Sequence, residues 1–94
     1  MDFEWDEAKS TANAGSRGFD FAYARRVFEG HCVESEDRRR SYGEKRVIAI
    51  GVVDDVHLTV VYTDRDTPDG HTVRRIISAR ISNRRERQAY AQDL

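Results

Sequence analysis

The chain has 94 residues, of which 38% are hydrophobic, 35% charged and 10% aromatic, a composition that suits one small folded domain, residues 1–94, and excludes a disordered chain. The single cysteine, Cys32, excludes an internal disulfide, and no Cys/His cluster predicts a metal or cofactor. No apolar run is long enough to span a membrane and the acidic start is unlike a signal peptide, so we expect a soluble, cytoplasmic protein.

The first part of the chain favours a short strand followed by two helices. Residues 3–5 alternate apolar and polar side chains, which is typical of a strand. Asp6 is placed to cap a helix over residues 7–13, and Asp20 is placed to cap a second one over residues 21–29. The apolar stripe of this second helix consists of Phe21, Ala24, Val27 and Phe28.

The rest of the chain favours an antiparallel sheet and a final helix. Segments rich in β-branched residues alternate with short turns, and strands joined by short turns must be antiparallel. We expect these strands at 32–36, 46–53, 56–63 and 72–81. Asn83, with Glu86 three residues later, is typical of a capping box that starts a helix ending near residue 92. The sequence therefore predicts an α+β domain, with two N-terminal helices packed on an antiparallel sheet and a C-terminal helix.

Arginines are concentrated near the C-terminus. The chain as a whole is nearly neutral, with 16 basic and 17 acidic residues, yet residues 74–87 hold six arginines and one acid. Because the planar arginine fork suits phosphates and carboxylates, this segment predicts an anionic partner, either nucleic acid or an acidic protein. Strict alternation places Arg74 and Arg80 on one face of the last strand, and Arg75 on the more apolar face that should meet the helices.

Motifs in both halves of the chain carry a resemblance. The first reads Phe3-Glu-Trp5-Asp6-x-x-Lys9-x-x-x-Asn13, then Gly18-Phe-Asp-Phe21-x-x-Ala24-x-x-Val27-Phe28. The last reads Arg75-Ile-Ile-Ser78-Ala79-Arg80-Ile-Ser-x-x-x-Glu86-x-x-x-Tyr90, with Ile-Ala-Ile-Gly51 and Val60-Val-Tyr62-Thr between the two. In order, spacing and total length these motifs resemble the BrnT toxin family over nearly the whole chain.

The resemblance implies a RelE-like fold and a ribonuclease toxin of a type II toxin–antitoxin pair, which inhibits translation by cleaving RNA. The implied partner is a BrnA-like antitoxin, which binds the toxin through one part and operator DNA through a ribbon-helix-helix part. Such pairs form a heterotetramer that represses its own operon, so the toxin would contact operator DNA only indirectly.

The chain departs from the family at one place. Members usually carry Asn-x-x-Lys-His-Gly, whereas this chain has Asn13-Ala-Gly-Ser16-Arg17-Gly18. A Lys-His pair can act as a general acid and base, but arginine cannot release its proton near neutral pH. The replacement therefore predicts a weak or unusually substrate-dependent ribonuclease.

The resemblance makes Arg80, Lys9 and Arg17 the catalytic candidates. Metal-free RNA cleavage needs a base, an acid and cations that stabilise the negative charge of the transition state. Arg80 can bind a phosphate with both arms of its fork, and Arg17 can stabilise charge. Lys9 can move a proton only if its pKa is lowered. The residues expected to bind RNA or to support the site are Trp5, Tyr62, Arg74, Glu86 and Tyr90. The three aromatic residues also have a structural interpretation as core packing, and Glu86 has one as a helix cap.

Two other functions remain open from the sequence. The chain can be a catalytically weak or inactive toxin homologue that acts as a co-repressor with a ribbon-helix-helix antitoxin, and the missing histidine favours this alternative. Direct DNA binding is the weaker interpretation, because no basic recognition helix with helix-turn-helix spacing is present.

Overall fold

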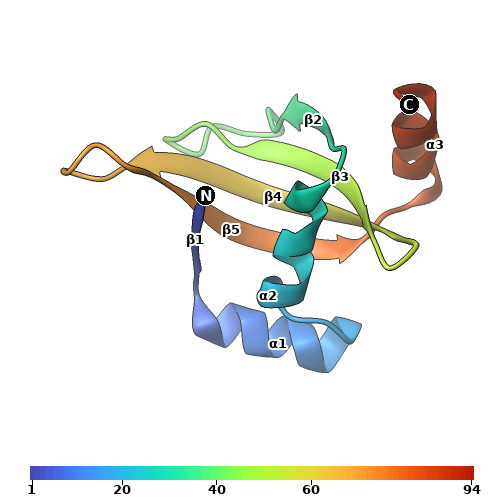
Figure 1. The fold of residues 1–94 in the computed structure, drawn as a ribbon, viewed down its shortest axis with the longest axis horizontal. Helices are drawn as coiled ribbons and strands as arrows, with labels where there is room; N and C mark the ends of the chain where they lie inside the picture. The colour runs from blue at the N-terminus through green and yellow to red at the C-terminus, as the bar shows by residue number, and fades with distance from the viewer.

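The computed structural model describes residues 1–94, which form one five-stranded sheet with helices on one of its faces and a C-terminal helix at one end (Figure 1). The elements in chain order are β1 (Asp2–Trp5), α1 (Glu7–Arg17), α2 (Phe21–Ala24), the 3₁₀ helix η1 (Arg25–Glu29), β2 (Val33–Glu36), β3 (Val47–Val53), β4 (Val56–Asp66), β5 (Thr72–Ile81) and α3 (Arg84–Gln92). The strand order in the sheet is β1-β5-β4-β3-β2. No helix is long and apolar enough to cross a membrane.

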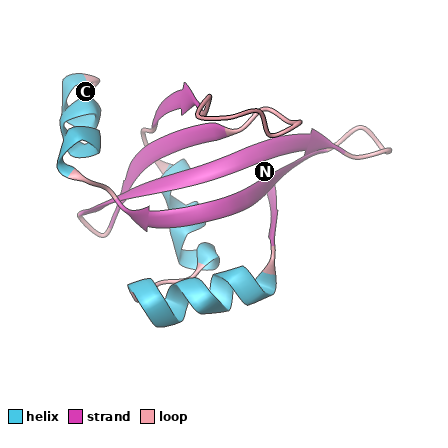
Figure 2. Ribbon diagram, turned by 180° about the vertical axis from the view of Figure 1, so that it is seen from behind, coloured by secondary structure: helices cyan, strands magenta, loops and turns pink.

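The predicted α+β class is confirmed, but the prediction of a purely antiparallel sheet is wrong. β2 to β5 are antiparallel neighbours, whereas β1 pairs with β5 in parallel. The parallel pair arises because α1, α2 and η1 lie between β1 and the rest of the sheet in the chain, and such a long connection can return a strand in the same direction. The N-terminal helices α1, α2 and η1 lie on one sheet face, and α3 stands at one end of the sheet (Figure 2).

The first helix is longer than the sequence predicts. Asp6 caps it as expected, since its carboxylate accepts a hydrogen bond of 3.2 Å from the backbone N–H of Lys9. The helix then continues through Gly15 to Arg17 and ends at Gly18, whose left-handed φ of 85° suits glycine. The prediction of an end near Asn13 is wrong, because the contacts of α1 with the sheet outweigh the weak helix propensity of one glycine.

The second predicted helix forms as α2 followed directly by η1. Its predicted apolar stripe is confirmed, with Phe21, Ala24 and Val27 at most 2% exposed. These side chains pack on Leu58, Val60, Ile76 and Ala79 of the sheet. We call the sheet face that carries these four residues the core face. The opposite face, which carries Thr59, Val61, Ser78 and Arg80, is the α3 face.

A β-bulge in β5 changes which of its side chains share a face. Val61 pairs with Ser78 but the next residue, Tyr62, pairs with Ile76, so Ile77 is an extra residue in β5. The alternation is therefore interrupted at this point. Strict alternation would put Ile76 on the same face as Arg80 and Arg75 on the face that meets the helices. Instead, Ile76 is buried on the core face and Arg75 lies on the α3 face, so both of these assignments are wrong.

A close approach of β3 to η1 requires glycine at position 51. A Cβ on Gly51 would lie 2.8 Å from the Cβ of Val27 and 3.2 Å from its carbonyl oxygen. We expect Gly51→Ala to lower the free energy of unfolding by about 1–3 kcal/mol, since the backbone must shift to remove this overlap. Urea denaturation followed by circular dichroism measures the change.

Gly15→Ala is the matched control for that substitution. Nothing lies within 4 Å of a Cβ at Gly15, which is inside α1. Alanine there should raise the free energy of unfolding by about 0.5–1 kcal/mol through its better helix propensity. Equal effects of the two substitutions would contradict the contact between β3 and η1.

The segment between β2 and β3 is ordered by a buried carboxylate. The Asp37 side chain is 1% exposed and accepts hydrogen bonds of 2.8 Å from both Nε and Nη2 of Arg39, and one of 3.1 Å from the Tyr42 hydroxyl. The hydrogen bonds from Arg39 hold the pKa of Asp37 well below its usual range, although burial of the carboxyl group raises it.

The depressed pKa of Asp37 predicts a loss of stability in acid. Its stabilising contribution is fully present above the unfolded-state pKa of about 4 and is lost as the pH falls towards the lower pKa of the folded state. Replacing Asp37 with asparagine should therefore reduce the drop in melting temperature between pH 7 and pH 3. Asp2→Asn is the control, because Asp2 is exposed and forms no ion pair. Identical pH dependence in both variants would refute the role of Asp37.

Candidate functional site

The C-terminal end of β5 presents an arginine held in a fixed orientation. Arg80 donates from Nη1 to Oε1 of Glu86 and from Nη2 to Oε2, both at 2.7 Å. The Glu86 side chain is 15% exposed, whereas that of Arg80 is 42% exposed. A two-armed contact of this kind restricts both the position and the plane of the guanidinium. Arg80 is therefore oriented by one carboxylate and still accessible to solvent.

The start of α3 fixes Glu86 in turn. The Asn83 side chain accepts a 2.9 Å hydrogen bond from the backbone N–H of Glu86, and Oε1 of Glu86 accepts one of 2.8 Å from the backbone N–H of Asn83. The predicted capping box is thus confirmed. Burial raises the pKa of Glu86, but the hydrogen bonds from Arg80 and Asn83 outweigh this effect and keep the pKa below its usual value. The carboxylate is therefore ionised at neutral pH.

Arg17 lies at the outer edge of β5, on the side where β1 pairs with the first part of the strand. Its Nη1 donates to the Ala79 carbonyl oxygen at 2.9 Å and to the side-chain oxygen of Asn13 at 3.1 Å. The carbonyl is available because β1 pairs with β5 only as far as Ile76 and leaves the rest of that edge without a strand. Arg17 is thus brought next to Arg80 in the fold, and it also has a structural role.

Lys9 and Arg17 lie on the same side of α1, eight residues apart. They line one shallow hollow together with Asn13, Ser16 and Ser78. Lys9 forms no salt bridge, and its side chain is exposed. Two of the three catalytic candidates therefore share a hollow beside β5, and the third, Arg80, follows Ser78 by two residues along the strand.

A group of cations surrounds this end of β5. We call it the basic rim, and it consists of Lys9, Arg17, Arg80, Arg84 and Arg85. Only Arg80 among them forms a salt bridge. The exposed acids Asp64, Asp66 and Asp69 belong to the β4–β5 hairpin, which lies at the opposite end of the molecule from α3 (Figure 1). Four of the five cations of the basic rim therefore have no acidic partner within salt-bridge distance, which leaves a locally positive surface on a nearly neutral chain.

Tyr62 and Arg74 lie away from the basic rim, on the core face. The Arg74 guanidinium is 4.0 Å from the centre of the Tyr62 ring and 4.8 Å from that of Phe28, and it pairs with both oxygens of Asp64. The Tyr62 hydroxyl donates to Glu34, and burial together with this contact raises its pKa. The prediction that Arg74 and Arg80 share a face is wrong, because the bulge lies between them.

The other two aromatic candidates are in packed positions. Tyr90 is 8% exposed, stacks edge-on against His57, and donates from its hydroxyl to the His31 carbonyl at 3.2 Å. Trp5 packs against the core, and its indole N–H donates to Glu7 at 2.8 Å. The structure does not bring Trp5, Tyr62 or Tyr90 together with Arg80, and their roles in RNA binding stay predictions.

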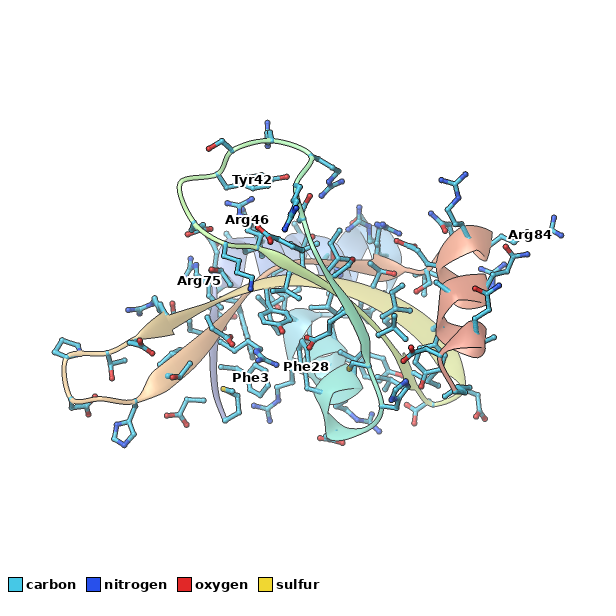
Figure 3. The ribbon with its side chains drawn as sticks, turned by 90° about the horizontal axis from the view of Figure 1, so that it is seen from above. Phe3, Phe28, Tyr42, Arg46, Arg75 and Arg84 are labelled. Atoms are coloured by element: carbon cyan, nitrogen blue, oxygen red, sulfur yellow. The ribbon has the colours of Figure 1, made fainter.

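Two arginines on the α3 side of the sheet are outside the predicted set of site residues. Arg75 lies on the α3 face and donates to Glu4 at 3.2 Å. Arg46 donates to Glu44 at 2.9 Å and lies over the Tyr42 ring. Figure 3 shows Arg46 on the opposite side of the sheet from Phe28. The bulge puts Arg75 on the face opposite to the one that regular alternation predicts. Arg46 directly precedes β3, and this place in the sequence was a signal that could have pointed to it.

A small α+β domain with a cationic rim and an oriented, accessible arginine has the features expected of a protein that binds anionic macromolecules. A family model described as the ribonuclease toxin BrnT of type II toxin–antitoxin systems matches residues 5–86, which include every residue of the basic rim and Glu86. The chain belongs to this family of toxins. A search of curated proteins finds no match to the chain.

Proposed function

We propose that this toxin cleaves RNA at the basic rim and that Arg80 contacts the phosphate under attack. The resulting loss of RNA would inhibit translation in the cytoplasm. The observation that carries the proposal is the accessible, oriented Arg80 among cations that have no acidic partners. Contacts of this kind to phosphates supply most of the affinity of proteins for nucleic acids. Family membership supports the ribonuclease activity at the level of the class.

The contact with Glu86 leaves Arg80 able to bind a phosphate. A guanidinium has five N–H donors, and Glu86 occupies one on each Nη atom. The remaining donors can reach the negative charge that develops on the phosphate oxygens in the transition state. Glu86 then acts as a positioning residue, since it holds the fork in place before RNA arrives, and donors held in place in advance need no reorganisation during the reaction.

The basic rim contains few side chains that can transfer a proton. Arg17 and Arg80 keep their protons at neutral pH, and the carboxylate of Glu86 is already hydrogen-bonded. Lys9 is the one residue of the basic rim that is not an arginine, and a lysine is the side chain type among them that can serve as an acid or a base. We therefore assign Lys9 as the general acid or base of a metal-independent reaction, with Arg17 stabilising charge beside it.

The partner that we propose is a BrnA-like antitoxin with a ribbon-helix-helix part. Membership in a type II toxin–antitoxin family supports a protein antitoxin. We expect a heterotetramer that contacts operator DNA only through the antitoxin. An acidic or amphipathic segment of the antitoxin would be attracted to the same cations as RNA.

One observation favours a second function, in which the chain is a catalytically inactive co-repressor of the antitoxin. No histidine belongs to the basic rim, and the hydroxyls of Tyr62 and Tyr90 are held at other places by Glu34 and the His31 carbonyl. A site with few proton carriers can keep RNA affinity and lose turnover.

Cleavage by the purified protein separates the two functions. The chain is incubated with total bacterial RNA, with and without EDTA, and the products are resolved by sequencing of their ends. Discrete cleavage that persists in EDTA is the expected result. In cells, induced expression should arrest growth, and coexpression of the antitoxin should relieve the arrest. RNA binding without cleavage, together with normal growth, would refute the proposal and favour the co-repressor function.

A further inference from the structure

Two hydroxyl groups are buried between the middle strand of the sheet and the start of α3. Oγ1 of Thr59, in β4, lies 2.7 Å from Oγ of Ser82, which directly follows β5. We call these two residues, which are 1% and 3% exposed, the hydroxyl pair. Packing alone does not require hydroxyls here, because Ile50 and Val61, the neighbours of Thr59 on the α3 face, are apolar and also buried. A buried hydroxyl is costly unless its hydrogen bonds are made, so the pair indicates a role beyond filling space.

The hydroxyl pair lies beside Arg80. Thr59 is the register partner of Arg80 across β4 and β5, so the two side chains leave the α3 face next to each other. The Thr59 hydroxyl also contacts the Glu86 carboxylate. Burial raises the pKa of Glu86, whereas donors that include Arg80 and the Thr59 hydroxyl lower it. The hydroxyl pair therefore belongs to the network that holds the Arg80 fork.

The negative charge of Glu86 sets the direction of these hydrogen bonds. An ionised carboxylate only accepts, and it has about four lone-pair sites. Arg80 and the backbone N–H of Asn83 fill three of them. Thr59 therefore donates its single hydroxyl proton to Glu86 and accepts the proton of Ser82. A side chain without a hydroxyl at position 59 would break this chain of hydrogen bonds at its middle.

Ser82 is also fixed through its backbone. Its N–H donates to the His57 carbonyl oxygen at 3.0 Å, and its carbonyl accepts from Nη1 of Arg87 at 2.8 Å. Ser82 thus joins the end of β5 to both β4 and α3. Because Arg80 precedes it by two residues and the N-cap Asn83 follows it, this junction sets where the guanidinium and the carboxylate meet.

We propose that Thr59, supported by Ser82, is a positioning residue for RNA cleavage, which holds Glu86 in place and leaves the remaining donors of Arg80 free for the phosphate. The inference rests on the ribonuclease function proposed above and names the residues that prepare Arg80 for it. Neither hydroxyl touches RNA, since both are buried. Without them the carboxylate loses its contact with the middle strand, and the plane of the fork is no longer fixed before RNA arrives.

Removal of the Thr59 hydroxyl tests the proposal. Thr59→Val keeps the shape of the side chain and lacks the donor. We expect it to slow single-turnover cleavage of a labelled RNA about tenfold, while the RNA dissociation constant changes less than about twofold. Thr59→Ser keeps the hydroxyl and should restore the rate. Ser82→Ala removes only the second hydroxyl and serves where the valine variant fails to fold, with a smaller loss of the same sign.

Thr63→Val is the matched control. Thr63 lies on the same strand and the same face, is 6% exposed, and donates its hydroxyl to the Lys45 carbonyl oxygen at 2.8 Å. This substitution removes a similar buried hydroxyl away from Arg80 and should leave the cleavage rate unchanged. Equal losses in Thr59→Val and Thr63→Val would overturn the proposal. A Thr59→Ser variant as slow as Thr59→Val would also overturn it, since the hydroxyl would then have no part in the effect.

A second measurement does not depend on cleavage. The carboxyl carbon of Glu86 is titrated by nuclear magnetic resonance in the folded chain. Loss of a donor that favours the ionised form should raise the pKa of Glu86 in Thr59→Val, and Thr63→Val should leave this pKa unchanged. An unchanged pKa of Glu86 in folded Thr59→Val would overturn the proposal.

Failure of the inference and failure of the proposed function give different results. If the unaltered chain cleaves RNA and Thr59→Val cleaves it at the same rate, the positioning role is refuted and the ribonuclease function stands. If the unaltered chain does not cleave RNA, the ribonuclease function is refuted, and the titration still decides whether Thr59 holds Glu86.

Discussion

Replacing Arg80 with glutamine is expected to slow RNA cleavage about 10²- to 10³-fold, the usual effect of removing one donor that stabilises transition-state charge. Glutamine keeps a hydrogen-bonding group near Glu86 but lacks the cation and the two-armed fork. Single-turnover cleavage of a labelled RNA measures the rate, and induced expression in bacteria measures toxicity. Arg80→Lys should recover part of the rate, because lysine restores the charge without the fork.

Arg26→Gln is the matched control for Arg80→Gln. Arg26 has the same exposed fraction as Arg80, 42%, and it also forms an ion pair, with Asp54. It lies in η1, outside the basic rim. We expect the Arg26 variant to cleave RNA at the normal rate. Undiminished toxicity of Arg80→Gln would remove Arg80 from the mechanism, and equal losses in both variants would indicate a general effect of losing one arginine.

The largest effect on stability is expected from Ile76→Ala, which should lower the free energy of unfolding by about 2–5 kcal/mol. Ile76 is 1% exposed and belongs to the core cluster beneath α2 and η1. The smaller side chain would leave a cavity between the sheet and these helices. For a domain of ordinary stability, about 5–15 kcal/mol, this is a large fraction of the total. Urea denaturation at 25 °C measures the difference.

The neighbouring residue is a control that also tests the bulge. Ile77 is of the same type as Ile76 but is the unpaired residue of β5, and it is only partly buried. Ile77→Ala should therefore cost clearly less than Ile76→Ala. The reverse order would show that β5 follows the regular alternation and that the bulge is absent.

Signals that act within a few residues were readable from the sequence. Asp6, Asp20 and Asn83 each accept a hydrogen bond from a backbone N–H in the first turn of the helix that follows, as predicted. Asp54 and Asp55, both with positive φ, form the predicted tight turn between β3 and β4. Such contacts depend on neighbours in the chain, so the sequence alone determines them.

Features that depend on distant parts of the chain could not be read in the same way. The parallel pairing of β1 with β5 joins residues about 70 positions apart and has no local signal. The bulge at Ile77 lies in a run of two isoleucines, and either of them suits the core. Since one extra residue exchanges the faces of a strand, this bulge decided whether Arg74 or Arg75 shares a face with Arg80.

The sequence predicted which residue types form the candidate site better than it predicted how they are arranged. The arginine-rich segment and Arg80 were recognisable from charge alone. The contact that orients Arg80 was not, because Glu86 has a sufficient local explanation as part of the capping box. The separation of Tyr62 and Tyr90 from the basic rim also required the fold, since their hydroxyls are bound to groups that are distant in the sequence.

Arg17 has a consequence for the solubility of the molecule. The outer strand of a sheet can add a strand from another chain, and an uncovered edge is a common starting point for aggregation. Beyond Ile76 the outer edge of β5 has no partner strand, and the Arg17 guanidinium occupies the Ala79 carbonyl there. A fixed charge on this edge hinders an approaching backbone. Arginine at this position therefore protects the folded monomer, a benefit that does not depend on catalysis.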